Sequence, residues 1–520
     1  MPNTRFGFPV TTAQARGTFG SVVLVTLVLK LWLAHWFPMT SDEAFFYLWA
    51  KFPNWGYYDH PPMIGWWLWV LDHLGGSPLV VRSATVVLTT VIACGVVVLL
   101  KRLLPAEQEA RAWLAGAVYL SLPVSWYGVF VTTDTPLIFF MSLAVLTYVL
   151  AVRKGSHGGV FLAGAFTGLA FLSKYFAVLL GIAFVLHLLL VQRNWRMVLC
   201  LAAGGLPFAL VNIAYNAFNC WNNIMFNLVN RHEDAHLGWQ TVVTYLGMML
   251  YVMSPWAVWA LVKGRAGWRG HSALVVALWV PLALFLFISL EKTIGLHWVL
   301  GFVPAAFVLL GLSATAEQMK RFVRWNAVLA VPHVVLFALL IHASPNIWKS
   351  SFRDDVVFHR QTDKVLKGLM AGMPKGAVLT TVAYSPASLL TYHHGQVVPV
   401  FGPGKYHARN DDVFVDWRQM AGKDIRIVAK DKPIDPASYA PYFESSTVKI
   451  ETIEGIPFTI VDGHAFDYEK FRNVVLREAV TKYYKIPKGL PVFDCPFGRK
   501  YGFEAECRIG DMGVLKSLLK

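Results

Sequence analysis

The stretch 41-SDEAFFYLWAKFPNWGYYDHPP-62 decides how this chain is interpreted, because it combines carboxylates with a high density of aromatic side chains. It follows an apolar run from Ser21 to Phe37. Asp42 and Glu43 open the stretch, and Asp59-His60 lie near its end. Aromatic residues of this density favour the headgroup level of a bilayer. We therefore predict a loop on a membrane surface that holds carboxylates where a lipid headgroup would sit.

The composition excludes an ordinary soluble protein. The chain has 520 residues, of which 56% are hydrophobic and only 15% are charged, whereas soluble domains carry about 25% charged residues. The net charge of +15 does not indicate a nucleic-acid partner, since the Lys and Arg residues of the first two-thirds form short clusters between apolar runs. That distribution is typical of cytoplasmic loops. The first apolar run has no small-residue cleavage site, so we expect a retained span and no cleavable signal peptide.

The apolar runs predict about eleven transmembrane helices, because one span needs about 20 largely apolar residues. The region Gly158 to Gln192 fits either one long helix or two short spans broken at Ser173-Lys174-Tyr175, and we favour two spans. With this break, every basic cluster falls on one side if the N-terminus is cytoplasmic. An odd number of spans then sends the C-terminus across the membrane. The expected spans lie near residues 18–38, 79–100, 112–130, 135–152, 159–173, 175–191, 198–215, 242–262, 272–290, 295–314 and 325–343.

The composition changes near Pro345, where charged residues become frequent. We therefore expect a membrane domain over 1–345, with a first extracytoplasmic loop over 39–78, and a soluble C-terminal domain over 346–520. The second domain is expected to be α+β, with strands near 377–383, 424–429 and 457–462 and a helix over 471–484. Cys495 and Cys507 lie at a spacing that a disulfide can close, and an extracytoplasmic location favours such a bond.

The predicted topology gathers acidic and mixed-charge residues on the non-cytoplasmic side. Ionisable groups at membrane depth are costly and usually functional. The candidate catalytic residues are Asp42, Glu43 and Asp134. The candidates for binding the donor phosphate or the substrate are Asp59, His60, Lys174, Tyr175, Arg231, Lys292 and His297.

Each candidate also has a structural interpretation. Ser41-Asp42-Glu43 is a helix-start signal, so its acids could cap a surface helix. Asp134 could cap the helix that contains Pro136, and Lys174 could extend to the membrane interface. His232 and His236, with Glu233 between them, have the spacing of a metal pair but lack a third ligand nearby, so we predict no metal site there.

Taken together, the motifs resemble those of the GT-C membrane glycosyltransferases. The matching pieces are Asp42-Glu43, the segment 56-GYYDHPP-62, Thr133-Asp134, Ser173-Lys174-Tyr175 and Lys292 with His297-Trp298. The resemblance covers roughly 18–345 and is to the group that includes protein O-mannosyltransferases and the aminoarabinose and galacturonic acid transferases of lipid A. It implies a multi-pass protein of a bacterial inner membrane, with the C-terminal domain in the periplasm.

The resemblance also implies a reaction. A sugar would pass from a polyprenyl-phosphate carrier to a lipid, glycan or protein acceptor at the periplasmic face, usually with inversion. Asp42 would act as general base or would orient the acceptor nucleophile, while Lys174, with Arg231 or Lys292, would hold the donor phosphate. Asp59 and Asp134 would complete the acidic side of the site. No cofactor is required, although a divalent metal is compatible with these residues.

One position departs from the family pattern. Aminoarabinose transferases typically carry Lys where this chain has His60, and a neutral imidazole binds phosphate more weakly than an ammonium group. The sugar and the acceptor are therefore left open. The alternative function is a lipid or solute transporter, which would place charges near the bilayer midplane and show repeated halves.

Overall fold

The computed structural model describes residues 9–230, 238–430, 435–486 and 489–507. The chain divides into two compact units, each assembled from separate segments. The first unit comprises Met1–Phe37, Gly75–Leu210 and Ala235–Leu339, and the second comprises Pro38–Leu74, Val211–Asp234 and Leu340–Lys520. The first loop thus groups with the C-terminal part of the chain. The division into 1–345 and 346–520 stays a prediction.

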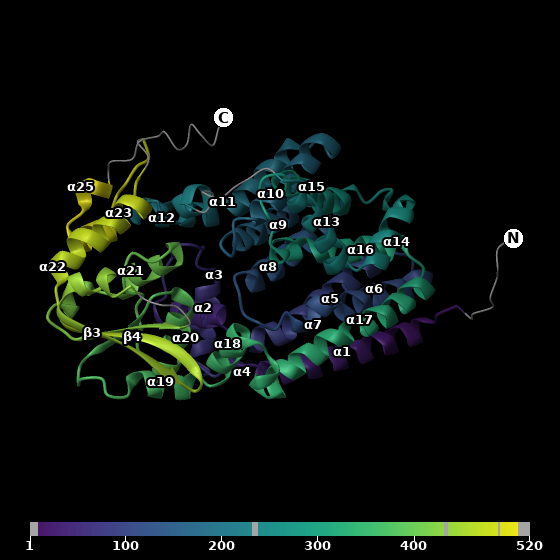
Figure 1. Ribbon diagram of the computed structural model, residues 1–520. Coiled ribbons are helices and arrows are strands. Elements are labelled where there is room, and N and C mark those ends of the chain that lie inside the picture. The colour runs from purple at the N-terminus through teal and green to yellow at the C-terminus, as the bar shows by residue number, and fades with distance from the viewer. Residues whose placement is uncertain (1–8, 231–237, 431–434, 487–488, 508–520) are drawn as a thin grey trace. The chain divides into compact units, whose positions relative to one another are not determined.

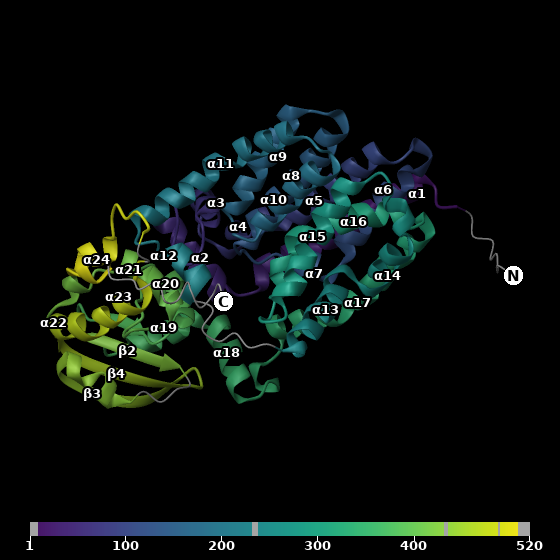
Figure 2. The ribbon, with the colours of Figure 1, turned by 90° about the horizontal axis from the view of Figure 1, so that it is seen from above.

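The first unit is a bundle of apolar helices, in which α5 and α6 lie side by side (Figures 1 and 2). Helices α11 and α17 each continue along the chain into the second unit. The helices are α1 (Thr12–Trp36), α4 (Pro78–Val81), α5 (Ser83–Leu103), α6 (Glu109–Ser121), α7 (Pro123–Tyr127), α8 (Asp134–Lys154), α9 (His157–Phe171), α10 (Ala177–Leu186), α11 (Trp195–Phe218), α13 (Trp239–Met253), α14 (Pro255–Lys263), α15 (Ser272–Ile288), α16 (Val303–Ser313) and α17 (Ala316–His342). Short 3₁₀ or π turns are η1 (Ala106–Gln108), η2 (His187–Val191), η4 (Arg265–Trp268) and η5 (Leu296–Phe302).

The lengths of these helices make the chain a polytopic helical membrane protein. Within the described residues, six helices are long and apolar enough to cross a membrane, or up to seven if α13 and α14, bent by 92°, form one span. Each of the eleven expected segments contains helix, and the expected break at Ser173-Lys174-Tyr175 falls between α9 and α10. Several of these helices are shorter than a full span, so the count of eleven stays a prediction.

Glycines allow α9 and α11 to pack closely. A Cβ atom on Gly164 would lie 2.1 Å from the Leu201 carbonyl oxygen, and one on Gly204 would lie 2.0 Å from the Phe161 oxygen. Each glycine therefore packs against the backbone of the other helix. Small residues are the usual means of close helix approach within membranes, and a larger side chain at either position would force the two helices apart.

The second unit combines helices with one β-sheet. Its helices are α2 (Ser41–Lys51), α3 (Met63–Asp72), α12 (Asn222–Met225), α18 (Ser350–Arg360), α19 (Thr362–Met370), α20 (Tyr384–His394), α21 (Asp411–Phe414), α22 (Tyr468–Phe471), α23 (Arg477–Tyr483), α24 (Pro496–Tyr501) and α25 (Glu504–Cys507). Its short 3₁₀ or π turns are η3 (Phe226–Asn230), η6 (Pro345–Ile347), η7 (Tyr406–Asn410), η8 (Trp417–Met420), η9 (Pro436–Ser438), η10 (Ala440–Tyr442) and η11 (Arg472–Leu476).

The sheet has the strand order β1-β2-β4-β3. Its strands are β1 (Val378–Thr381), β2 (Ile425–Lys430), β3 (Phe443–Ile453) and β4 (Ile456–Phe466), of which β2, β4 and β3 are labelled in Figure 2. Strands β1 and β2 run parallel, whereas β4 is antiparallel to both β2 and β3. The two-residue turn between β3 and β4 has positive φ at Glu454 and Gly455, as tight hairpins require.

The expected strands near 377–383, 424–429 and 457–462 correspond to β1, β2 and β4, and the expected helix over 471–484 corresponds to η11 and α23. Strand β3 was not expected. It lies at the edge of the sheet and most of its side chains are exposed or half-buried, so it lacks the apolar run by which the other strands were recognised.

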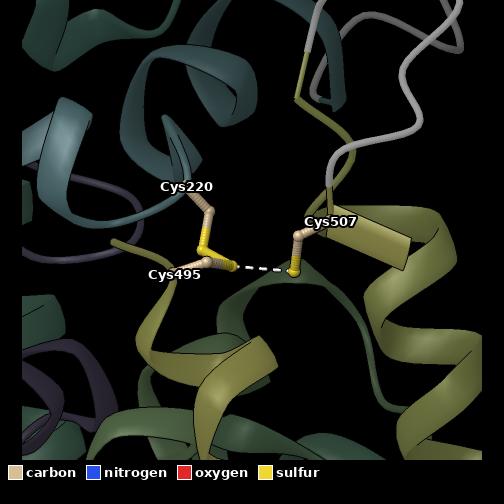
Figure 3. A group of neighbouring side chains, drawn as sticks. All are labelled: Cys220, Cys495 and Cys507. Atoms are coloured by element: carbon tan, nitrogen blue, oxygen red, sulfur yellow. Dashed lines mark hydrogen bonds between the residues drawn. A yellow bond between two sulfur atoms is a disulfide. The ribbon is translucent and has the colours of Figure 1, made fainter. Parts of the chain in front are cut away.

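The expected Cys495–Cys507 disulfide is wrong. The structure joins Cys495 to Cys220, which is 275 residues away and lies two residues after the end of α11. Cys507 lies outside the disulfide, with its sulfur 2.8 Å from Cys495 Sγ (Figure 3). All three sulfurs lie within 4.8 Å of one another and are buried. Spacing along the chain favoured the nearer pair, whereas the fold brings a distant third cysteine into the same cluster.

This cluster predicts a defined change of disulfide pairing. Non-reducing peptide mass spectrometry of the wild-type protein should find Cys220 linked to Cys495. The Cys220→Ser variant should instead form Cys495–Cys507, because the two remaining sulfurs already lie within reach. A Cys495–Cys507 linkage in the wild-type protein would contradict the structure.

Candidate active site

The first part of the predicted surface loop is a helix, as the helix-start signal at Ser41-Asp42-Glu43 indicated. Helix α2 begins with a capping box. Thr40 Oγ1 accepts a hydrogen bond from the Glu43 backbone N–H at 3.2 Å, while the Glu43 carboxylate accepts bonds from Thr40 N and Oγ1 at 3.1 and 3.0 Å. Glu43 is fully buried. The capping interpretation is therefore confirmed for Glu43, and its catalytic role stays a prediction.

Asp42 lies one position earlier, and its side chain is exposed. Partial desolvation by the surrounding protein raises the pKa of its carboxyl above the ordinary value, the nearby His407 lowers it, and the charges of Glu43 and Asp59 raise it. Of the two acids that open α2, Asp42 is the accessible one. An accessible carboxylate with a raised pKa is suited to accept a proton from a substrate.

Aromatic side chains hold the second half of the loop in place. The Tyr57 ring stacks on Trp49 of α2 with centroids 4.0 Å apart, and its hydroxyl donates to the carbonyl oxygens of Trp49 and Phe52 at 3.1 Å. Gly56 packs so closely on the Tyr215 ring that a Cβ atom there would lie 2.6 Å from the ring carbons. The aromatic density of loop one therefore forms a packed cluster that positions the following residue pair, Asp59-His60.

Asp59 is fully buried and bound from the C-terminal part of the chain. Its carboxylate oxygens accept hydrogen bonds from His407 Nδ1 at 3.2 Å and from Asn410 Nδ2 at 3.3 Å. Burial alone would raise the pKa of Asp59, but the hydrogen bond from His407 and the charges of His60 and His407 bring it below the ordinary value. Asp59 is thus an ionised carboxylate inside the protein, and its burial makes it a supporting group.

Two asparagines secure the backbone of the same loop. Asn223 Nδ2 donates to the Tyr57 carbonyl oxygen at 2.7 Å, and Asn227 Nδ2 donates to the Asp59 carbonyl oxygen at 3.1 Å. Both asparagines come shortly after Cys220, where the disulfide joins this segment to the C-terminal part of the unit. His407, Asn410, Asn223 and Asn227 were not anticipated, since no local pattern marks them; their contacts span 166 to 351 residues.

The first unit holds a different charged pair. Lys174 Nζ lies 2.9 Å from both carboxylate oxygens of Asp134, and both side chains are buried. Lys174 therefore does not extend to an interface, and the N-cap of α8 is Thr133 rather than Asp134. Both structural alternatives are wrong for these residues. Tyr175 lies beside Lys174 in the chain, and its ring contacts Phe171.

The remaining candidates, Lys292, His297 and Arg231, belong to neither of the charged groups described above. Lys292 and His297 lie in the first unit between α15 and α16, where Lys292 is half-buried and His297 is exposed. His297 contacts the neighbouring Trp298 ring. Arg231 and the 232–236 segment lie outside the described residues.

The structure thus forms two groups of site residues. Asp42, Asp59 and His60 share the second unit with His407 and Asn410, while Asp134, Lys174 and Tyr175 share the first unit. Among the described residues, the cluster of side chains close enough to share a metal ion consists of the three cysteines and includes none of these candidates. A divalent metal in the reaction stays an untested expectation.

Comparison with known proteins identifies the class of fold. The family model for dolichyl-phosphate-mannose-protein mannosyltransferases matches residues 59–215. The lipid A galacturonosyltransferase RgtD of Rhizobium johnstonii is 28% identical over 282 residues, which cover 49% of this chain and 55% of that protein. The match thus spans about half the length of this curated relative.

Solved structures agree with this match. Crystal structures of ArnT from Cupriavidus metallidurans, bound to undecaprenyl phosphate and in the apo state, align with TM-scores of 0.58 and 0.59. The sequence identities are 16% and 15%, and each alignment covers 86% of this chain and 98% of the solved chain. The resemblance to the GT-C membrane glycosyltransferases is confirmed, and the chain has their fold.

The Asp134–Lys174 pair allows a stability test. Asp134→Asn removes the carboxylate that pairs with the buried Lys174 ammonium, which we expect to destabilise the protein by about 3–5 kcal/mol. The double variant Asp134→Leu/Lys174→Met, which removes both charges, should be markedly more stable than Asp134→Asn. Thermal unfolding in detergent compares the three proteins. Destabilisation of the double variant equal to or larger than that of the single variant would show that the pair is not charge-coupled.

Proposed function

We propose that this protein is a glycosyltransferase that moves a sugar from a polyprenyl-phosphate carrier to a lipid acceptor at the periplasmic face of the membrane. The fold supports this proposal, since one solved relative with the same fold binds undecaprenyl phosphate. The relative that acts on lipid A favours a lipid acceptor of that kind over a protein or a glycan. In this proposal the N-terminus is cytoplasmic and the second unit lies outside the cytoplasm.

The observation that carries the proposal is the contrast between the two loop-one aspartates. Asp59 is buried and ionised, whereas Asp42 is exposed and has a raised pKa. Two carboxyl groups whose environments move their pKa values in opposite directions are typical of acid–base sites. We assign Asp42 as the general base that meets the acceptor, and Asp59 as the group that organises its surroundings.

In the transfer step, the acceptor oxygen forms a bond to the anomeric carbon as its proton passes to Asp42. The bond between that carbon and the carrier phosphate breaks, and its electron pair stays on the phosphate oxygen. Attack opposite the leaving group inverts the anomeric configuration. The leaving phosphate gains charge in this step, and a cation beside it would lower the barrier.

Lys174 is the candidate for that cation, with Lys292 and Arg231 as further candidates. Because Asp134 already neutralises Lys174, a phosphate at this position would compete with the carboxylate for the ammonium group. Asp134 would then hold the Lys174 ammonium group in place between catalytic cycles. When the donor binds, the ammonium group would contact both the Asp134 carboxylate and the donor phosphate. His60, beside Asp59, replaces the lysine of aminoarabinose transferases, so we leave the sugar open among galacturonic acid, aminoarabinose and mannose.

The central test is sugar transfer by purified Asp42→Asn protein. The substitution is nearly isosteric and removes only charge and basicity, so we expect a loss on the order of 10²–10⁴-fold in rate. The assay supplies undecaprenyl-phosphate-linked sugars and lipid A, and follows the modified lipid by mass spectrometry.

A matched control is Asp363→Asn, since Asp363 is also an exposed aspartate at the second position of a helix, α19. This control should transfer at the wild-type rate. Wild-type activity in Asp42→Asn would remove Asp42 from the mechanism. Absence of transfer by the wild-type protein with every donor would favour the alternative, a lipid or solute transporter.

The raised pKa of Asp42 predicts an acid limb in the pH profile. Transfer needs the ionised carboxylate, so the rate should fall as the pH is lowered through this pKa, which lies above the ordinary aspartate value of 3.8. The charged groups that act on Asp42 are Glu43, Asp59 and His407. Rates measured from about pH 4 upward should show this limb in the wild-type protein. The limb should be absent from the residual activity of Asp42→Asn, and its persistence there would assign it to another group.

A further inference from the structure

A short turn of the C-terminal sequence, η7, contributes two polar side chains to loop one. His407 and Asn410 are three residues apart and bind the two oxygens of the same carboxylate, Asp59. An ionised carboxylate only accepts hydrogen bonds, so His407 Nδ1 is the donor. Asp59 therefore determines both the tautomer and the orientation of the imidazole when the ring is neutral.

The two partners differ in their access to solvent. The Asp59 side chain is 1% exposed, whereas the His407 side chain is 28% exposed. A substrate can therefore reach the imidazole but not the carboxylate behind it. A buried carboxylate that orients an accessible imidazole is the arrangement by which many enzymes hold a histidine for proton transfer or for positioning.

The ring is also held from its other sides. Tyr384 of α20 lies 4.6 Å from the His407 ring centroid, and Phe45 of α2 and Phe226 of η3 lie 6.2 and 6.1 Å away. Phe45 is one helical turn after Asp42, and His407 is among the charges that act on Asp42. The imidazole thus lies where the C-terminal sequence meets the start of α2.

We propose that the C-terminal part of the chain takes part in sugar transfer through His407, a positioning residue that Asp59 holds beside α2, the helix that carries the reactive carboxylate of Asp42 in its first turn. This inference rests on the proposed function and gives the C-terminal sequence a role in it. In its protonated form, His407 keeps Nδ1–H on Asp59 and has Nε2–H left as a donor, which holds the Asp42 carboxylate in the orientation that receives the acceptor's proton. Asn410 donates to the other carboxylate oxygen of Asp59. His407 is therefore held at one oxygen only, which fixes the orientation of its ring.

The test separates this role from a merely structural one. In His407→Asn, the amide nitrogen takes the place of Nδ1 and can still donate to Asp59, while the imidazole is lost. We expect kcat to fall on the order of 100-fold, with little change in KM for the lipid-linked donor and little change in thermal stability. His407→Ala should lose both activity and stability, because it leaves Asp59 buried with one donor fewer.

The chain offers a matched control in the His393–Asp363 pair, whose Nδ1–Oδ1 distance is 2.6 Å. His393→Asn should transfer at the wild-type rate. Wild-type kcat in His407→Asn, in a preparation where the wild-type protein is active, would overturn the inference and leave the proposed function intact.

A second measurement does not depend on transfer. Diethylpyrocarbonate acylates accessible neutral imidazoles, and peptide mass spectrometry gives the rate at each histidine. We expect Asp59→Asn to change the rate at His407 several-fold and to leave the rate at His393 unchanged. An unchanged rate at His407 would show that Asp59 does not orient the ring. If the wild-type protein transferred no sugar, the proposed function would fail while this measurement still tested the orientation.

Discussion

A carboxylate buried away from water needs hydrogen-bond donors or a counter-charge. In the second unit this applies to Asp59, which is fully buried. The energetic cost of an unpaired buried charge is several kcal/mol, so hydrogen bonds from His407 and Asn410 are a condition of the fold as well as a feature of the site. The partners lie about 350 residues further along the chain. The hydrogen bonds of a single charged side chain, Asp59, therefore connect loop one to the C-terminal sequence. The stacking of Tyr57 on Trp49 fixes the position of the loop at which these bonds form.

The same requirement governs the charges of the helical bundle. Lys30 donates to the Thr85 carbonyl oxygen and to Thr89 Oγ1, and Lys174 is paired with Asp134. Arg82 donates to carbonyl oxygens at the end of α1. These interactions satisfy the buried cations with groups from neighbouring helices, so a buried charge in the bundle is not by itself a sign of catalysis. In the second unit, by contrast, Asp42 is an exposed carboxylate in the first turn of α2, and its part in catalysis is a proposal.

Sequence patterns predicted those parts of the fold that depend on local physics. Long apolar runs gave helices, the polar break at Lys174 separated α9 from α10, and apolar segments gave β1, β2 and β4. Sequence patterns did not predict the secondary structure correctly where the local signals were weak or ambiguous. Strand β3 is an exposed edge strand without an apolar run. The start of loop one fitted both a surface loop and a helix start, and it is a helix because Thr40 and Glu43 cap it reciprocally. Asp42 and Glu43 are adjacent and chemically alike, and only their burial distinguishes an exposed acid from a capping residue.

The sequence by itself determined the membrane-embedded helical class, the resemblance to GT-C glycosyltransferases and the residue types from which the site is drawn. Hydropathy and short motifs encode these properties, because each depends on residues that are close together in the chain. The tertiary structure decided which residues meet. It paired Cys220 with Cys495, engaged Lys174 with Asp134, and brought His407 and Asn410 to Asp59. Such contacts depend on packing between distant segments, and no spacing in the sequence records which of many compatible partners the folded chain will bring within hydrogen-bond distance.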